Sequence, residues 1–234
     1  MSAGVFRFRQ FTIHQDKCAM KVGTDAVLLG SWVNAADAKN ILDIGTGTGI
    51  IAMMLAQKSN ARIDAIDICP EACTQANENI KESLWLEKIF VHHVSFQEFS
   101  SVTKKKYDLI VSNPPYFSDA PKPLTLGRIQ SRHTDLLPFK ELISGVKKII
   151  SPDGKFCVVL PCREGAAFID EAMMQGLFCG NILHVKTKTE KLEKRLLMEF
   201  TLNLKNLDES EMVIRCSDNE FSREYVEMTK EYYL

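Results

Sequence analysis

The chain has 234 residues, of which 45% are hydrophobic and 25% are charged, and its formal net charge is −1. This length and composition fit one globular α/β domain with additional elements and exclude a disordered or fibrous chain. The near-neutral charge argues against a protein that grips nucleic acid over its whole surface.

The first residues lack a basic segment followed by an apolar core, and no apolar stretch is long enough to span a bilayer. We therefore expect no signal peptide, no membrane association and a cytoplasmic location. The seven cysteines are odd in number and form no matched C-x-x-C pairs, and the histidines are scattered, so we expect no metal site. Cations cluster at 104–106, at 186–195 and at Arg7 and Arg9, and each cluster alone fits a solvated surface.

After residue 40, short apolar runs alternate with amphipathic segments. The expected strands are 41–44, 61–67, 89–95, 107–112, 155–161, 182–187 and 196–204. The expected helices are 24–33, 50–58, 70–83, 139–150, 164–175 and 222–233. Strand–helix alternation predicts a mostly parallel sheet with helices on both faces. The last two strands are joined too closely for a crossover helix, so we expect an antiparallel hairpin at one edge.

The first of these strands leads into a glycine-rich loop. The segment "ILDIGTGTGI" places Gly45, Gly47 and Gly49 between a strand and a helix. Glycines let a ligand approach the backbone, and the helix start offers unpaired N–H donors. Residue 50 is isoleucine, so the G-x-G-x-x-G dinucleotide fingerprint is not met. Asp43, just before the loop, would repel a diphosphate and attract an ammonium group.

The second strand ends in Asp67, and a carboxylate at this position can accept both hydroxyls of a ribose. The two acids together predict a nucleoside with a cationic amino-acid tail and no phosphates, which is S-adenosyl-L-methionine. A glycine loop alone would be weak evidence, because a tight turn with no ligand also explains it. The combination with Asp67 favours the cofactor.

These motifs give residues 41–204 a resemblance to the class I S-adenosylmethionine-dependent methyltransferases. That resemblance implies a Rossmann-like, seven-stranded sheet with an antiparallel final strand. It assigns the donor site to four strand ends: Asp43, Gly45, Thr46, Gly47 and Gly49, then Asp67 and Ile68, then Phe96 and Gln97, then Asn113. Many members of the family have an acid in the third loop, where this chain has Phe96 and Gln97.

The fourth strand leaves the core through "VSNPPYF". It should neighbour the first strand, so its end should face the methyl donor. An aromatic amine is a poor nucleophile, and two acceptors aimed at its N–H bonds would draw it toward a tetrahedral geometry. The Asn113 side-chain oxygen and the Pro114 carbonyl can be these two acceptors. Pro115 stiffens the backbone that holds them in place. Tyr116 offers a flat face on which a base can stack. Alone, the two prolines would more simply end a strand.

The N-P-P-Y tetrapeptide resembles the signature of amino-methyltransferases that act on adenine N6, cytosine N4 or glutamine amides. Three hypotheses therefore remain: N6 methylation of adenine in RNA, amide methylation of a translation release factor, and a non-catalytic RNA-binding protein with a vestigial donor pocket. About 40 residues precede the first strand, which is too few for the helical domain that usually accompanies the second activity. Failure to bind S-adenosylmethionine would favour the third.

The whole chain also resembles the bacterial enzymes that N6-methylate adenosine 37 of a valine tRNA. The resemblance rests on "FRFRQFTIHQDKCAMKVGTDAVLLGSW", "LDIGTGTG", "NPPYF", "RHTDLLPF" and "FSREYVEMTKEYY". It implies that 113–116 meet the target base, that Thr24 and Asp25 lie near the donor, and that residues 1–40 pack on the donor site of the domain at 41–234. tRNA is then the expected partner, and no obligate protein partner is evident.

Adenosine 37 lies in a hairpin loop, where a base can be flipped out at modest cost. Phe117 is a candidate to hold that base, and core packing is an equal alternative. Arg128, Arg132 and His133 follow in a stretch rich in Pro, Ser and Thr. We expect Arg132 to contact a phosphate, with surface solvation as an equal alternative.

Overall fold

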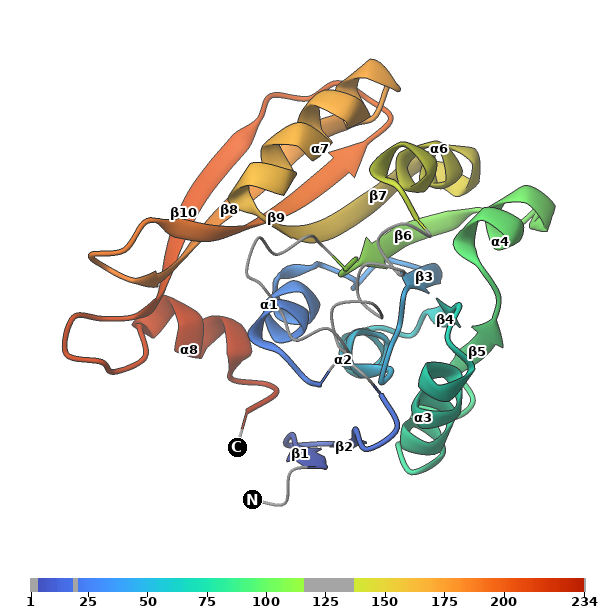
Figure 1. Cartoon of the computed structure of the whole chain (residues 1–234), viewed down its shortest axis with the longest axis horizontal. Coiled ribbons are helices and arrows are strands. Elements are labelled where there is room, and N and C mark those ends of the chain that lie inside the picture. Colours follow the sequence, from blue (N-terminus) through green and yellow to red (C-terminus); the bar gives the residue numbers. More distant parts are fainter. Residues whose placement is uncertain (1–3, 19–20, 116–136, 234) are drawn as a thin grey trace, which may run out of the picture.

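The structure is a computed structural model, and it describes residues 4–18, 21–115 and 137–233. Within these residues, eight strands form one sheet in the order β10-β8-β9-β7-β6-β3-β4-β5, and β1 and β2 form a separate hairpin (Figure 1). The strands are β1 (Val5–Arg7), β2 (Thr12–His14), β3 (Asn40–Ile44), β4 (Arg62–Asp67), β5 (Ile89–His93), β6 (Tyr107–Ser112), β7 (Ile150–Pro161), β8 (Phe178–Lys188), β9 (Glu193–Thr201) and β10 (Asp208–Arg215). The helices are α1 (Thr24–Trp32), α2 (Ile50–Lys58), α3 (Pro70–Lys81), α4 (Phe96–Val102), α6 (Phe139–Ile149), α7 (Cys162–Met174) and α8 (Arg223–Thr229).

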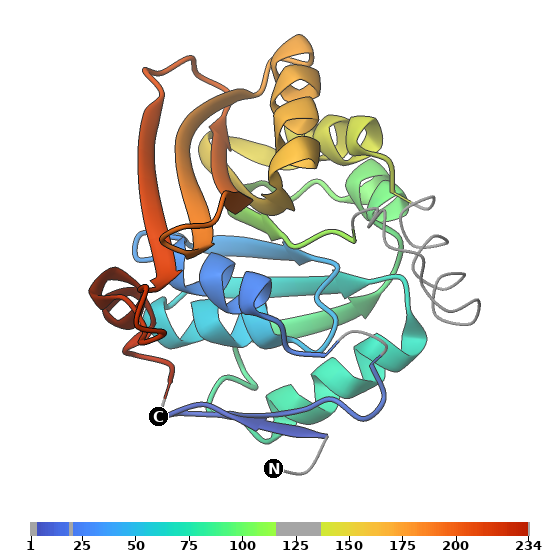
Figure 2. The ribbon, with the colours of Figure 1, turned by 60° about the vertical axis from the view of Figure 1, so that its left-hand side comes forward.

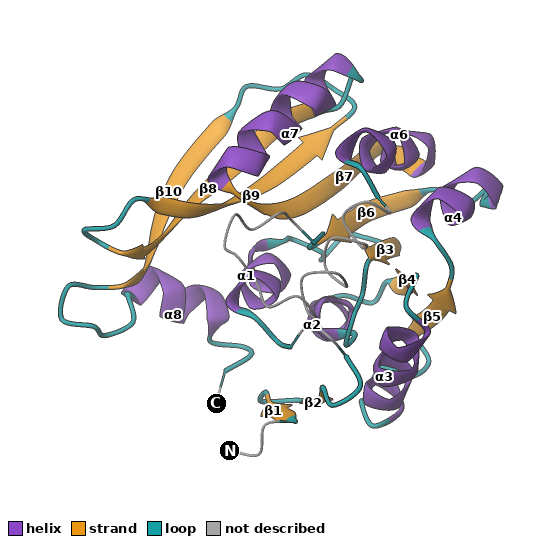
Figure 3. Cartoon of the chain, in the orientation of Figure 1, coloured by secondary structure: helices purple, strands orange, loops and turns teal. Residues whose placement is uncertain are grey.

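The predicted fold class is confirmed. Every strand predicted from the sequence lies in the large sheet, and β9 runs antiparallel to both β7 and β8 while the other neighbours are parallel. Helices α1 and α2 cover one face, and α4, α6 and α7 cover the other (Figures 1 and 3). Strand β3 lies between β4 and β6, where the chain order reverses, which is the usual ligand site in open α/β sheets.

One strand prediction was wrong, and one hairpin was missed. The hairpin of β8 and β9 is not at the sheet edge, because β10 pairs in parallel with β8 and forms an eighth strand. Its sequence, "DESEMVIR", begins with four exposed residues and buries only Met212, so it has the pattern of a solvated segment. The β1–β2 hairpin was also missed, because three-residue strands give too little alternation to detect.

Each face of the sheet has its own apolar core. Along β3, Ile41 packs in the core shared with α1, α2 and α8, whereas Leu42 and Ile44 pack in the core shared with α6 and α7. Because side chains alternate across a strand, Asp43 lies on the face of Ile41, toward α2. The strand pattern therefore directs this carboxylate under the glycine turn that joins β3 to α2.

The segment after β2 is fastened to α3 by amide side chains. The His14 backbone N–H donates to Asn79 Oδ1 and its carbonyl accepts from Asn79 Nδ2, each at 2.9 Å. The Lys17 N–H donates to Gln75 Oε1 at 2.9 Å. Asn79 Nδ2 also donates to the Thr48 carbonyl at 2.9 Å, so one buried amide joins this segment to the glycine turn.

Candidate active site

The glycine turn presents bare backbone to open space. Gly45, Gly47 and Gly49 all have positive φ, at +72°, +56° and +83°, a conformation that L side chains rarely adopt. A Cβ added at Gly45 or Gly47 would meet nothing within 4 Å, whereas one at Gly49 would lie 3.4 Å from the Ala76 Cβ. Gly49 is therefore explained by packing as well as by φ. The space above Gly45 and Gly47 is where a ligand could reach the backbone.

Asp43 carries a buried carboxylate oxygen with no partner. Its side chain is fully buried, and Oδ2 accepts a hydrogen bond from the Thr46 hydroxyl at 2.7 Å. Oδ1 has no hydrogen-bond partner among the described residues. Burial, with a smaller contribution from the charge of Asp67, raises the pKa of Asp43 to about 7 against the opposing effects of the Thr46 hydroxyl and the Ala52 backbone N–H. A buried, unsatisfied carboxylate is costly for the protein alone, and a cationic ligand group would satisfy it.

Asp67 fixes the shape of the turn. Its Oδ2 accepts the Gly47 N–H and its Oδ1 accepts the Cys69 N–H, both at 2.9 Å. A carboxylate oxygen has more than one lone pair, so both oxygens can accept a further hydrogen bond from a ligand hydroxyl. Ile68 follows with 37% of its surface exposed and offers an apolar contact beside the carboxylate.

The third predicted donor contact lies at the start of α4. The Phe96 side chain is only 4% exposed and packs against Gly145 of α6, where a Cβ would clash with its ring. Gln97 Nε2 donates to Glu141 Oε2 at 2.9 Å. Both side chains are thus engaged with α6, and a contact between them and an adenine stays a prediction.

The end of β6 lies directly beside the glycine turn. Ser112 pairs with Ile44 in the parallel register, and its hydroxyl donates to the Ile44 carbonyl at 3.0 Å. Asn113 directly follows β6 and Gly45 directly follows β3. Neighbouring strands are about 4.8 Å apart. Asn113 is half-buried and Pro114 is buried. The structure therefore brings the predicted amine-binding residues to the tip next to the predicted donor turn.

Thr24 and Asp25 open α1 at the same edge of the sheet. Thr24 is exposed, and Asp25 Oδ2 pairs with Arg195 Nε at 2.8 Å. Arg195 is opposite Pro161, at the carboxyl end of β7. The ion pair therefore holds the start of α1 against the beginning of β9, beside the carboxyl end of β7.

Comparison with known proteins identifies the family. Residues 18–189 match the family model described as the methyltransferase small domain. The tRNA1(Val) (adenine(37)-N6)-methyltransferase of Trichodesmium erythraeum is 42% identical, over 100% of this chain and 99% of the relative. The protein of the same name from Bacteroides fragilis is 44% identical, with the same coverage. The chain belongs to this methyltransferase family.

Solved structures support the class I methyltransferase fold of this family member. A predicted O-methyltransferase from Agrobacterium tumefaciens superposes with a TM-score of 0.68 at 16% identity, covering 89% of this chain and 96% of that one. The ribosomal protein L11 methylase of Lactobacillus delbrueckii subsp. bulgaricus gives a TM-score of 0.53 at 17% identity, covering 75% and 76%. These likenesses show the fold alone.

Some predicted site residues of this methyltransferase are not placed, and some placed residues were not predicted. Tyr116, Phe117, Arg128, Arg132 and His133 lie outside the described residues. Two amides that position the segment over the turn, Gln75 and Asn79, were missed, because they lie on a helix whose pattern explains them as ordinary polar positions. In 4–18, 21–115 and 137–233 there is no metal-binding group of three or more His, Cys, Asp or Glu, and no helix long and apolar enough to cross a membrane.

Proposed function

We propose that this protein is an S-adenosylmethionine-dependent methyltransferase that modifies the N6 amine of adenosine 37 in valine tRNA. The observation that carries the proposal is the register of β3 and β6, which sets Asn113 beside the glycine turn. Full-length relatives that are 42% and 44% identical, named for this reaction, support the same substrate. A tRNA substrate also supports action in the cytoplasm.

The donor site follows from three groups of this chain. The free Oδ1 of Asp43 would receive the ammonium group of the donor, directly or through water, and the bare backbone at Gly45 and Gly47 leaves room for its methionine part. Asp67 would accept the ribose hydroxyls while its N–H partners keep it in place. S-adenosyl-L-methionine, when bound, supplies an electrophilic methyl group on a sulfonium. We further propose that residues 1–40 cover this site, since His14 and Lys17 are tied to α3 beside it.

The amine site follows from the stiff backbone after β6. The Asn113 side-chain oxygen and the Pro114 carbonyl would each accept one N–H of the adenine amine. Because neither group needs to move, they stabilise the developing tetrahedral nitrogen without reorganisation cost. No strong base is required, because the proton leaves after the nitrogen has become cationic. Tyr116 and Phe117 would stack on the flipped base, and Arg128, Arg132 and His133 would contact RNA; these roles remain predictions.

The direct test is methylation of total tRNA from cells that lack this protein, followed by mass spectrometry of the nucleosides. We expect N6-methyladenosine at position 37 of valine tRNA only when the purified protein and S-adenosylmethionine are both present. Transfer to a glutamine amide of a release factor, with no product in tRNA, would replace this proposal with the second activity.

A further inference from the structure

A basic cleft is lined by residues of the N-terminal hairpin, the ends of β8 and β10, and α8. Figure 2 shows how these elements are arranged. Its volume is about 830 Å³. Its cationic lining side chains are Arg7, Arg9, Lys188, Lys191, Arg215 and Lys230. No acidic side chain lines it in the described part of the chain. A cleft of one charge sign focuses potential and attracts ligands of the opposite sign.

The cleft unites charges that are far apart in the sequence. Arg7 and Arg9 come from one cation cluster and Lys188 and Lys191 from another, and β10, which the sequence did not reveal, adds Arg215 opposite Lys188. Each cluster alone fits a solvated surface. Together they make a concave site with one charge sign, which a solvated surface does not require.

Several of these charges are free for a ligand, and others are held in place. Arg7, Lys188 and Lys191 have no ion-pair partner among the described residues. Arg215 stacks its guanidinium on Phe221, 3.9 Å from the ring centroid. Arginine held by stacking loses less freedom on binding, which favours planar recognition of phosphate.

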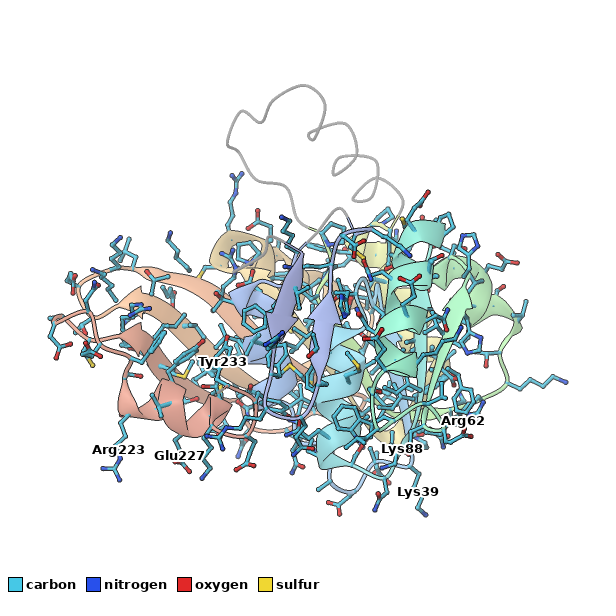
Figure 4. The ribbon with its side chains drawn as sticks, turned by 90° about the horizontal axis from the view of Figure 1, so that it is seen from below. Lys39, Arg62, Lys88, Arg223, Glu227 and Tyr233 are labelled. Atoms are coloured by element: carbon cyan, nitrogen blue, oxygen red, sulfur yellow. The ribbon has the colours of Figure 1, made fainter. Side chains whose placement is uncertain are left out.

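The remaining two cations contact groups near the C-terminal end of the described chain. Arg9 Nε donates to the Tyr233 carbonyl at 2.6 Å. Lys230 is paired with Glu227, which hangs from the outer side of α8 (Figure 4). The pairing partly neutralises Lys230, so we assign the ligand mainly to the other five.

The cleft lies at the sheet edge that carries the active site. Strands β8 and β10 run in the direction of β6 and β7, so Lys188 and Arg215 are at the carboxyl edge of the sheet. Thr24, which also lines the cleft, begins α1 beside the Asp25–Arg195 pair. With β8 three positions from β6, and Lys188 five residues beyond the level of Asn113 in the register, the cleft lies on the order of 20–25 Å from Asn113. One extended ligand could occupy both the cleft and the site at Asn113.

We propose that this basic cleft binds the phosphate backbone of the RNA substrate at a distance from the target base, an assignment that rests on the proposed function. It explains how a nearly neutral chain holds a polyanion: six cations are gathered in one cleft. A single nucleoside or a very short RNA would reach the amine site without reaching the cleft.

The test compares Lys188→Ala/Lys191→Ala with the matched control Lys39→Ala/Lys104→Ala. The control removes the same charge from exposed lysines just before β3 and β6, at the opposite edge of the sheet; Figure 4 shows Lys39 there with Arg62 and Lys88. Binding of valine tRNA is measured from 50 to 200 mM salt, together with methylation of that tRNA and of a trinucleotide containing the target adenosine.

We expect the cleft variant to raise the KM for tRNA at least about tenfold and to reduce the salt slope of binding by about 1–2. The kcat, the KM for the trinucleotide and the binding of S-adenosylmethionine should stay unchanged. The charge-conserving variant Lys188→Arg/Lys191→Arg should retain wild-type tRNA binding. The control variant should behave as wild type. An affinity and salt slope equal to wild type in the cleft variant would overturn the proposal.

Two further results separate this proposal from others. Wild-type protein that binds tRNA through the cleft without methylating it would refute the proposed function and leave the cleft assignment intact. If polyglutamate competes with tRNA as well as an RNA of equal charge does, the cleft is a site for acidic polypeptides and the RNA assignment is wrong.

Discussion

The two halves of the carboxyl edge of the sheet carry opposite charge. At β3 and β4 the functional groups are the acids Asp43 and Asp67, which face a glycine turn. At β8 and β10 they are cations such as Lys188 and Arg215. A cationic donor and a polyanionic substrate can therefore be recognised on one sheet by separate groups, and Asn113 stands between the two. Variants that touch one function and spare the other test this division.

The largest effect on turnover is expected from a change at Asn113, which lies between the two halves. Asn113→Ala removes one of the two proposed acceptors, and loss of one preorganised partner of this kind typically costs about 10²–10³-fold in turnover. The dissociation constants for S-adenosylmethionine and for tRNA should change little. Single-turnover methylation and calorimetric donor binding measure the two effects, and turnover equal to wild type would refute the polarising role.

The pH dependence of donor binding at Asp43 tests the role of the acidic half. Because the pKa of Asp43 is raised to about 7, the cofactor-free protein holds a proton on this carboxyl below about pH 7, and a cationic donor must displace it. Donor affinity should therefore increase by up to about tenfold per pH unit as the pH rises toward 7 and level off above it. Asp43→Asn should weaken donor binding about 10–100-fold at pH 8 and remove this pH dependence.

The same shift predicts the pH dependence of stability. A raised folded-state pKa means that the folded protein binds more protons than the unfolded chain between the two values, so this group's contribution to stability is lost as the pH rises toward 7. Cofactor-free Asp43→Asn should therefore lose less stability than wild type between pH 5 and pH 8 in urea unfolding. Parallel curves for the two proteins would contradict the assignment.

A smaller effect is expected from Gly47→Ala. Its φ of +56° costs a residue with a Cβ about 1–2 kcal/mol, and the new methyl group would project into the space reserved for the donor. Unfolding free energy should fall by that amount, and donor affinity should fall further. As a control, the Gly47→Ala variant should bind tRNA with the same salt dependence as wild type, because the substitution leaves the basic half of the sheet edge unchanged.

The smallest effect is expected from Tyr232→Phe. The Tyr232 hydroxyl donates to the Met54 carbonyl of α2 at 3.0 Å and thereby anchors the C-terminal segment to the donor side of the protein. Its loss should cost about 1 kcal/mol of unfolding free energy and little activity. A selective loss of tRNA affinity in this variant would mean that the anchor also shapes the cleft.

The acidic half was largely predictable from the sequence, and the basic half was not. Asp43, the glycines and Asp67 are local signals, because each follows a strand whose apolar run is easily seen and parallel strands bring their ends together. The cleft depends on β10, which shows only Met212 as a buried residue, and on contacts between segments some 180 to 220 positions apart. No local pattern carries that information.

The same division applies within the donor site. The sequence indicated that an acid precedes the turn, but not that one of its oxygens is buried without a partner, since this depends on how α2 covers β3. Phe96 shows the opposite case: the sequence placed it in a loop, whereas it begins α4, a helix that was not predicted, and its burial against Gly145 follows from the packing of α6.

The contact between Arg9 and residues 232–233 also bears on how the protein is made. The Arg9 N–H donates to the Tyr232 carbonyl at 2.8 Å, and the Arg9 side chain to that of Tyr233. Since a ribosome delivers residues in order, Arg9 gains these partners only after the sheet and its helices have been synthesised. A nascent chain can therefore form its glycine turn before the basic cleft is complete.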